Sequence, residues 1–240
     1  MTSRMSGVAY ARTAGLLFLL TFVIWGLAEG YPHSVLIVHD DATATASKII
    51  AGKSLFRIGV AGALVGSLCG VALTFFFYLL MRPAGRDLAL LALIFQIISM
   101  TGFAMIQVPY YAALPILSGG DYLKSFSPDQ LNSLALLSVR TSGFIKVLFE
   151  LHYGAGFMLL GYLMLRSRFL PILIGLSMMI SGAGLMAKPF CSVLAMPQAS
   201  TAVTFAFLGG ALVVMTWLLI MGVDEAKWQE SAAAMEGQGA

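Results

Sequence analysis

The chain has 240 residues, of which 59% are hydrophobic and only 10% are charged, and its mean hydropathy is +0.90. Soluble domains carry about 25% charged residues, so this composition excludes a water-soluble domain and indicates an integral membrane protein. The net charge of +3 is small. The basic residues gather at the ends of apolar segments, which indicates membrane topology and excludes nucleic-acid binding.

Roughly six apolar segments are long enough to cross a bilayer, because each span needs about 20 apolar residues. The predicted spans are residues 13–30, 55–81, 88–113, 143–165, 170–188 and 202–223. Their apolar runs are continuous rather than alternating, which favours helices over a β-barrel. We therefore expect an all-α membrane protein, a bundle of about six transmembrane helices. Residues 1–223 are predicted to form a single transmembrane domain and residues 224–240 a short, frayed cytoplasmic tail.

The first span has some features of a signal peptide, because Arg4 and Arg12 precede its apolar run. The residues after the run, Leu27, Ala28 and Glu29, fit a small-x-small cleavage site poorly. We expect this segment to remain attached as an uncleaved transmembrane helix.

Two connections between spans are long and polar. In the first, Asp40 or Asp41 can cap a helix, and residues 42–53 are predicted to form a helix at the membrane interface that leads into the second span. In the other, residues 128–142 are predicted to be an amphipathic lead-in to the fourth span, with Pro128 near the helix start, where proline is tolerated.

The orientation follows from arginines in the short loops. Residues 82–87 ("RPAGRD") and 166–168 ("RSR") are rich in arginine, and Arg4 and Arg12 precede the first span. The positive-inside rule places these regions in the cytoplasm. We therefore expect a multi-pass protein of the inner membrane with both termini cytoplasmic and both long connections facing outward.

Glycines at helical spacing predict close helix contacts. Gly62, Gly66 and Gly70 are four residues apart, which forms a groove that lets another helix approach. Similar contacts are expected at Gly154, Gly161, Gly175 and Gly182. The same glycine faces are also the expected contact surfaces between chains in a homo-oligomer.

The predicted fourth span carries three ionisable groups near its outer end, namely Lys146, Glu150 and His152. Charges inside a bilayer are costly, so they usually face the bundle interior or a water-filled cavity and form pairs. Lys146 and Glu150 are four residues apart on one helix face, so we expect them to neutralise one another. His152 projects toward a different neighbour.

Other polar residues lie at the outer ends of their spans, whereas Gln96 stands out in the inner half. The candidate ligand-binding residues are Glu29, Arg57, Gln107, Tyr110, Tyr111, Lys146, Glu150, His152 and Lys188. One interpretation is an outward-facing polar cavity that binds a small amphiphile, a lipid or an ion. The alternative is a structural network or scaffold, in which the lysines reach the interface by snorkelling.

An intramembrane enzyme acting on an isoprenoid or lipid is a further alternative. Glu150 would be its general acid or base, assisted by Glu29 or His152. The sequence lacks the hydrolase patterns G-x-S-x-G and H-E-x-x-H, and it suggests no cofactor. A zinc site from His33, His39, Asp40 and Asp41 would be loose, so we predict no metal. Because no motif indicates a reaction, binding is favoured over catalysis.

Several stretches resemble a bacterial integral-membrane family catalogued as domain of unknown function 4386. The resemblance is strongest in residues 11–59, with an Arg-x-Ala-Gly start at Arg12, the "DATATA" turn and the "SLFRIG" entry to the next helix. Residues 117–137 and 161–175 are also similar. The chain departs from the usual pattern at Lys48 and Lys53. The resemblance implies a multi-span inner-membrane protein and no particular activity.

Overall fold

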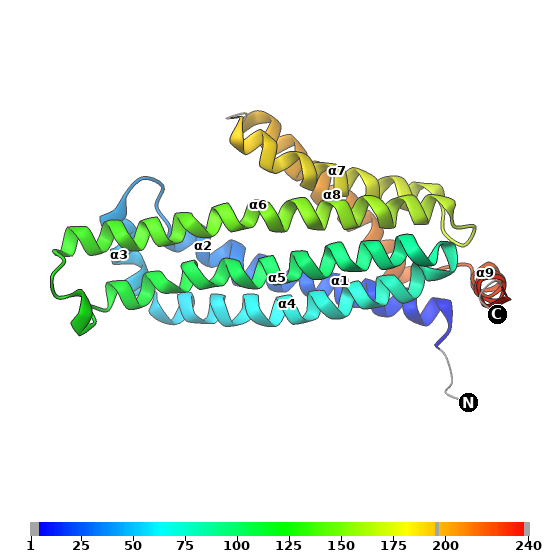
Figure 1. The fold of residues 1–240 in the computed structure, drawn as a ribbon, viewed down its shortest axis with the longest axis horizontal. Helices are drawn as coiled ribbons and strands as arrows, with labels where there is room; N and C mark the ends of the chain where they lie inside the picture. The colour runs from blue at the N-terminus through cyan, green and yellow to red at the C-terminus, as the bar shows by residue number, and fades with distance from the viewer. Residues whose placement is uncertain (1–4, 195–196, 238–240) are drawn as a thin grey trace. The chain divides into compact units, whose positions relative to one another are not determined.

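The computed structural model describes residues 5–194 and 197–237, and within this part of the chain every regular element is helical. The elements are α1 (Gly7–Trp25), η1 (Gly26–Gly30), α2 (Tyr31–Leu36), α3 (Ala42–Ala51), α4 (Lys53–Met81), η2 (Arg82–Ala84), α5 (Arg86–Leu117), η3 (Asp121–Leu123), α6 (Pro128–Arg166), α7 (Ile172–Val193), α8 (Pro197–Ile220) and α9 (Glu225–Gly237). Figure 1 labels the helices α1 to α9. The predicted all-α fold class is confirmed.

Five stretches of helix in the described chain are long and apolar enough to cross a membrane. They are Gly7–Leu36, Lys53–Ala84, Arg86–Leu117, Ile172–Cys191 and Thr201–Ile220. The predicted span 143–165 lies within α6, which is not among these five. A multi-pass membrane protein is therefore supported by the structure, and a count of six spans stays a prediction.

The helix starts follow local rules that the sequence indicated. Asp41 caps α3, because its carboxylate accepts a hydrogen bond of 2.8 Å from the backbone N–H of Ala44. Such a cap satisfies one of the donors that lack a partner at the start of a helix. Helix α6 begins at Pro128 and continues without a break to Arg166, so the lead-in and the predicted fourth span form one helix.

The chain divides into two compact units, which we describe separately. Unit 1 comprises residues 1–19, 70–99 and 149–240, and unit 2 comprises residues 20–69 and 100–148. Helices α1, α4, α5 and α6 each contribute one part to each unit.

In unit 1, the α6–α7 contact depends on glycine. A Cβ atom placed on Gly154 would lie 2.7 Å from the carbonyl oxygen of Gly182, and one on Gly161 would lie 2.9 Å from that of Gly175. The two backbones are thus too close for any side chain at these positions, which confirms the predicted close contacts. Elsewhere in the unit, Phe18 packs edge-on against two further aromatic rings of the core.

In unit 2, α4 approaches the first helical stretch of the chain through its glycines. A Cβ atom placed on Gly62 would lie 2.7 Å from that of Ala28, and one on Gly66 would lie 2.7 Å from the indole ring of Trp25. This close approach was predicted from the glycine spacing, and here it joins two helices of one chain. Association of two chains through glycine faces stays a prediction.

The C-terminal segment is ordered in unit 1, which contradicts the expected frayed tail. The Glu225 carboxylate accepts hydrogen bonds from the N–H groups of Gly7 (3.1 Å) and Val8 (2.7 Å) at the start of α1. Trp228 is buried, and its indole N–H donates to the carbonyl oxygen of Leu80 (3.0 Å). The expectation was wrong because α9 is polar overall and is held by only a few long-range contacts, which local sequence patterns do not indicate.

The Glu225 carboxylate is an effective cap because it stays ionised. Its partial burial opposes ionisation, but the N–H donors of Val8 and Gly7 and the Gln229 amide together hold its pKa below the ordinary value of 4.5. A negative charge at a helix N-terminus is also favoured by the helix dipole.

Candidate functional site

The candidate site lies in unit 2 and consists of Glu29, His33, Tyr110 and Lys146, which we call the Glu29–Lys146 cluster. Glu29 comes from η1, His33 from α2, Tyr110 from α5 and Lys146 from α6. Three separate parts of the chain therefore supply a carboxylate, an imidazole, a phenol and an ammonium group to one region of the unit.

Glu29 lies in a segment of unusual backbone. Residues Gly26–Gly30 form a π-helix between α1 and α2, and π-helical segments occur frequently at functional sites. The helical path continues into α2, where Pro32 occupies one of the first two positions. This continuation brings His33 into the site, four residues beyond Glu29.

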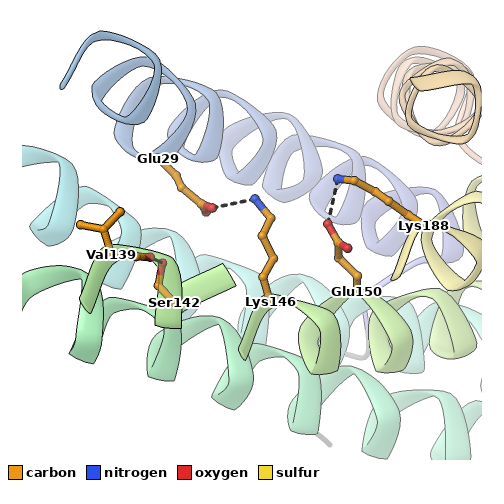
Figure 2. A network of polar contacts seen from close by, with 6 residues as sticks. All are labelled: Glu29, Val139, Ser142, Lys146, Glu150 and Lys188. Atoms are coloured by element: carbon orange, nitrogen blue, oxygen red, sulfur yellow. Dashed lines mark hydrogen bonds and ion pairs between the residues drawn. The ribbon is translucent and has the colours of Figure 1, made fainter. Parts of the chain in front are cut away.

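Lys146 and Glu29 form an ion pair within unit 2, with 3.0 Å between Nζ and Oε1 (Figure 2). The Lys146 side chain is 42% exposed and that of Glu29 is 23% exposed. The pair is thus only partly covered by protein and can be reached from one side.

His33 and Tyr110 form an aromatic stack beside the ion pair. The Tyr110 ring stacks with those of His33 (centroids 6.0 Å apart) and Phe56 (4.7 Å apart). Lys146 and Glu29 both act electrostatically on His33, and Glu29 also acts on Tyr110. Tyr110 is 8% exposed, and its hydroxyl group has no hydrogen-bond partner among the described residues. A buried hydroxyl without a partner is costly, so the site retains an unused donor.

A second ion pair lies in unit 1, where Lys188 Nζ is 2.8 Å from Glu150 Oε1 (Figure 2). Glu150 is nearly buried, with 8% of its side chain exposed, and Lys188 is 30% exposed. Lys146 thus contacts Glu29 and Glu150 contacts Lys188, each partner coming from another segment of the same unit. The expected pairing of Lys146 with Glu150 stays a prediction.

The other candidate residues have different surroundings in the two units. In unit 1, the His152 ring contacts that of Phe95 (centroids 6.1 Å apart). In unit 2, Gln107 is buried, whereas Arg57 and Tyr111 are exposed. Gln96 is buried in unit 1, and neither polar atom of its amide has a partner among the described residues.

Sequence reasoning missed His33 as a member of the site. It ended the first span at residue 30 and placed His33 in a polar loop. The useful signal was the spacing of four residues between Glu29 and His33, which puts both on one face if the helix continues. The π-helical segment and the proline made that continuation hard to recognise.

Unit 2 also contains an open hollow of about 410 Å³. Its lining residues are Phe126, Asp129, Gln130, Ser133, Leu134 and Leu137. None of the predicted site residues lines it. Across the described part of the chain, no three His, Cys, Asp or Glu side chains are grouped so that they could hold a metal ion.

Comparison with known proteins gives one match. No curated protein and no solved structure matches the chain. The model of the family described as "Domain of unknown function (DUF4386)" matches residues 13–222, and the chain therefore belongs to that family.

Proposed function

We propose that this chain is a multi-pass protein of the bacterial inner membrane that binds a small amphiphile at the Glu29–Lys146 cluster, on the outer side of the membrane. Both termini are cytoplasmic in this proposal. The orientation is supported by the arginines of the two short loops at residues 82–87 and 166–168. The bacterial inner membrane is supported by the resemblance of the sequence to its family.

The observation that carries the proposal is the partial exposure of the Glu29–Lys146 pair. Charged groups within helices of this kind usually mark functional positions. Lys146 is 42% exposed, so the packed helices leave part of the pair uncovered. An incoming polar head group can therefore reach the ammonium and the carboxylate.

The surroundings of the pair suit an amphiphile. Large apolar side chains next to the pair in the sequence are exposed, namely Leu27, Tyr31, Phe144 and Leu148, at 67%, 56%, 76% and 57%. Small-molecule sites combine apolar surface with a few polar groups that fix orientation. A head group on the ion pair with an apolar tail on these side chains matches that composition.

Catalysis is less well supported than binding. Its expected acid or base, Glu150, contacts Lys188 and is nearly enclosed by protein.

Native mass spectrometry of the purified protein tests the proposal. The wild-type protein should carry a co-purifying amphiphile, and Lys146→Met should lose it. Arg140→Gln is the matched control, because it breaks the exposed ion pair with Asp40 in the same unit and should keep the bound molecule. Equal occupancy in Lys146→Met and wild type, or a wild-type protein that takes up no amphiphile even when one is added, would refute the proposal.

A further inference from the structure

We propose that the start of α4, in unit 2, binds the head group of an anionic phospholipid of the surrounding bilayer. The lipid phosphate lies at Lys53 and Arg57, and one acyl chain follows the same face of the helix. This surface shares no residue with the Glu29–Lys146 cluster, and its occupant is a lipid of the membrane itself.

The segment formed by α3 and the start of α4 carries an excess of positive charge. Its three cations, Lys48, Lys53 and Arg57, are all exposed. Within the described part of the chain, none of the three forms an ion pair. Residues 42–86 contain no aspartate or glutamate. Of the two carboxylates just before α3, Asp41 caps that helix and Asp40 is in another ion pair. The segment therefore offers unbalanced positive charge to an anion from outside the chain.

The length of α4 places two of these cations at the level of lipid head groups. The helix has 29 residues and is about 44 Å long. A bilayer with its head-group regions is about 40–45 Å thick, so the first turn of a spanning α4 lies among the head groups. Lys53 and Arg57 are four residues apart and share one helix face. A guanidinium group can bind a phosphate through two parallel hydrogen bonds, and an ammonium group adds a point charge.

The same face of α4 continues from the cations as an exposed apolar stripe. Ala61, Leu64 and Leu68 follow Arg57 at helical spacing. All three are exposed, with Leu64 at 45% and Leu68 at 72%. The stripe from Arg57 to Leu68 is about 17 Å long, close to half of the ~30 Å hydrocarbon core. One acyl chain of a single leaflet can therefore lie on the stripe while its phosphate contacts the cations. A soluble anion would use the cations alone, so the combination favours a membrane lipid.

Helix α3 adds to the positive charge at this membrane surface. Lys48 lies in its last turn, and only Gly52 separates α3 from α4. Ile50, which is 45% exposed, provides apolar surface beside this lysine in the sequence. Basic residues close to a membrane surface attract anionic lipids by about fivefold in affinity for each residue, equivalent to about 1 kcal/mol.

Native mass spectrometry with two lipids tests the proposal. The purified protein in a nonionic detergent is mixed with equal amounts of phosphatidylglycerol, which is anionic, and phosphatidylcholine, which is zwitterionic, with identical acyl chains. Wild type should retain phosphatidylglycerol in preference to phosphatidylcholine by about fivefold or more. Lys53→Gln and Arg57→Gln should each reduce this preference, and the double variant should abolish it. The single variants also cover the case in which the double variant fails to fold.

The matched control is Lys124→Gln/Arg140→Gln. It also removes one exposed lysine and one exposed arginine from unit 2, but these two cations pair with Asp121 and Asp40. It should keep the preference of the wild type. Glycerophosphoglycerol, which is the anionic head group without acyl chains, should not displace the bound lipid at equal concentration.

The outcomes separate this surface from the Glu29–Lys146 cluster. Lys146→Met should keep the preference for phosphatidylglycerol. If Lys146→Met loses it and Lys53→Gln/Arg57→Gln keeps it, the anionic lipid binds at the cluster, and the α4 surface is refuted while the proposed function stands. Equal retention of the two lipids by wild type, or equal losses in the double variant and its matched control, would also overturn the proposal. Displacement by glycerophosphoglycerol would show a site for a soluble phosphate and refute the membrane lipid.

Discussion

The two ion pairs should differ in strength according to their burial, and a double-mutant cycle can measure the difference. For Glu150–Lys188 the cycle uses wild type, Glu150→Gln, Lys188→Met and the double variant. Two unit charges 2.8 Å apart attract with about 6 kcal/mol at an effective dielectric constant near 20. Loss of hydration offsets most of this attraction.

We expect a net coupling of about 2 kcal/mol for this pair, within the usual range for contacting charges. Glu29–Lys146 is longer and more exposed, at 3.0 Å with 23% and 42% exposure, so its coupling should be about 1 kcal/mol. The Asp40–Arg140 pair, with 85% and 53% of the side chains exposed, should contribute a coupling near zero. The predicted order of coupling therefore follows the order of burial.

The assay is equilibrium unfolding in mixed micelles, with increasing SDS and helix content followed by circular dichroism. Each single variant at Glu150–Lys188 should lower the free energy of unfolding, and the double variant should recover part of the loss. Losses at Glu150 and Lys188 that add within about 0.3 kcal/mol, or a larger coupling at Asp40–Arg140, would refute the reasoning that burial controls these pairs.

Further predictions concern topology, capping, packing and the C-terminal helix. With both native cysteines replaced by serine, Ala84→Cys should be shielded from an impermeant thiol reagent in intact cells, and Asp121→Cys should react with it. Equal labelling of the two positions would contradict the proposed orientation. Asp41→Ala should cost about 0.5–2 kcal/mol of local stability and speed proteolysis between α2 and α3, whereas an unchanged rate would show that the cap is dispensable. Gly182→Val should disrupt the α6–α7 contact and lower stability, while Gly26→Ala, where a Cβ meets nothing within 4 Å, should be neutral or stabilising. Glu225→Gln should lower stability at pH 7. The folded pKa of this carboxyl lies below 4.5, so its contribution is present above about pH 4.5 and is lost as the pH falls through the folded value; an equal effect of Glu225→Gln at pH 7 and below the folded pKa would contradict the role of its charge.

Much of the fold could be predicted from local sequence. Hydrophobic runs indicated the helices, Asp41 indicated the start of α3, and Pro128 indicated the start of α6. Glycine spacing indicated close helix approach at Gly62 and Gly66. These features depend on residues near one another in the chain, where propensity, capping and periodicity act directly.

The candidate site could be predicted only in part, because it depends on contacts between distant helices. Glu29, Tyr110 and Lys146 were recognised as polar groups in apolar surroundings. The ion pair between Lys146 and Glu29 could not be predicted, because it depends on which segment packs beside α6. His33 was missed because a π-helical segment adds a residue to the turn and shifts the faces that follow it. Periodicity calculated for an ordinary α-helix does not include such a shift.

The contact between α9 and the start of α1 has a consequence for the order of events during synthesis. The first residues of α1 leave the ribosome early, yet the carboxylate that satisfies their N–H groups belongs to Glu225, close to the end of the chain. Domains usually fold from the N-terminus as they are made, whereas this end of unit 1 is completed only after Glu225 has been made. A chain that stops before α9 would lack the carboxylate that caps its first helix, so the first turn of α1 would keep unsatisfied N–H groups until α9 is present.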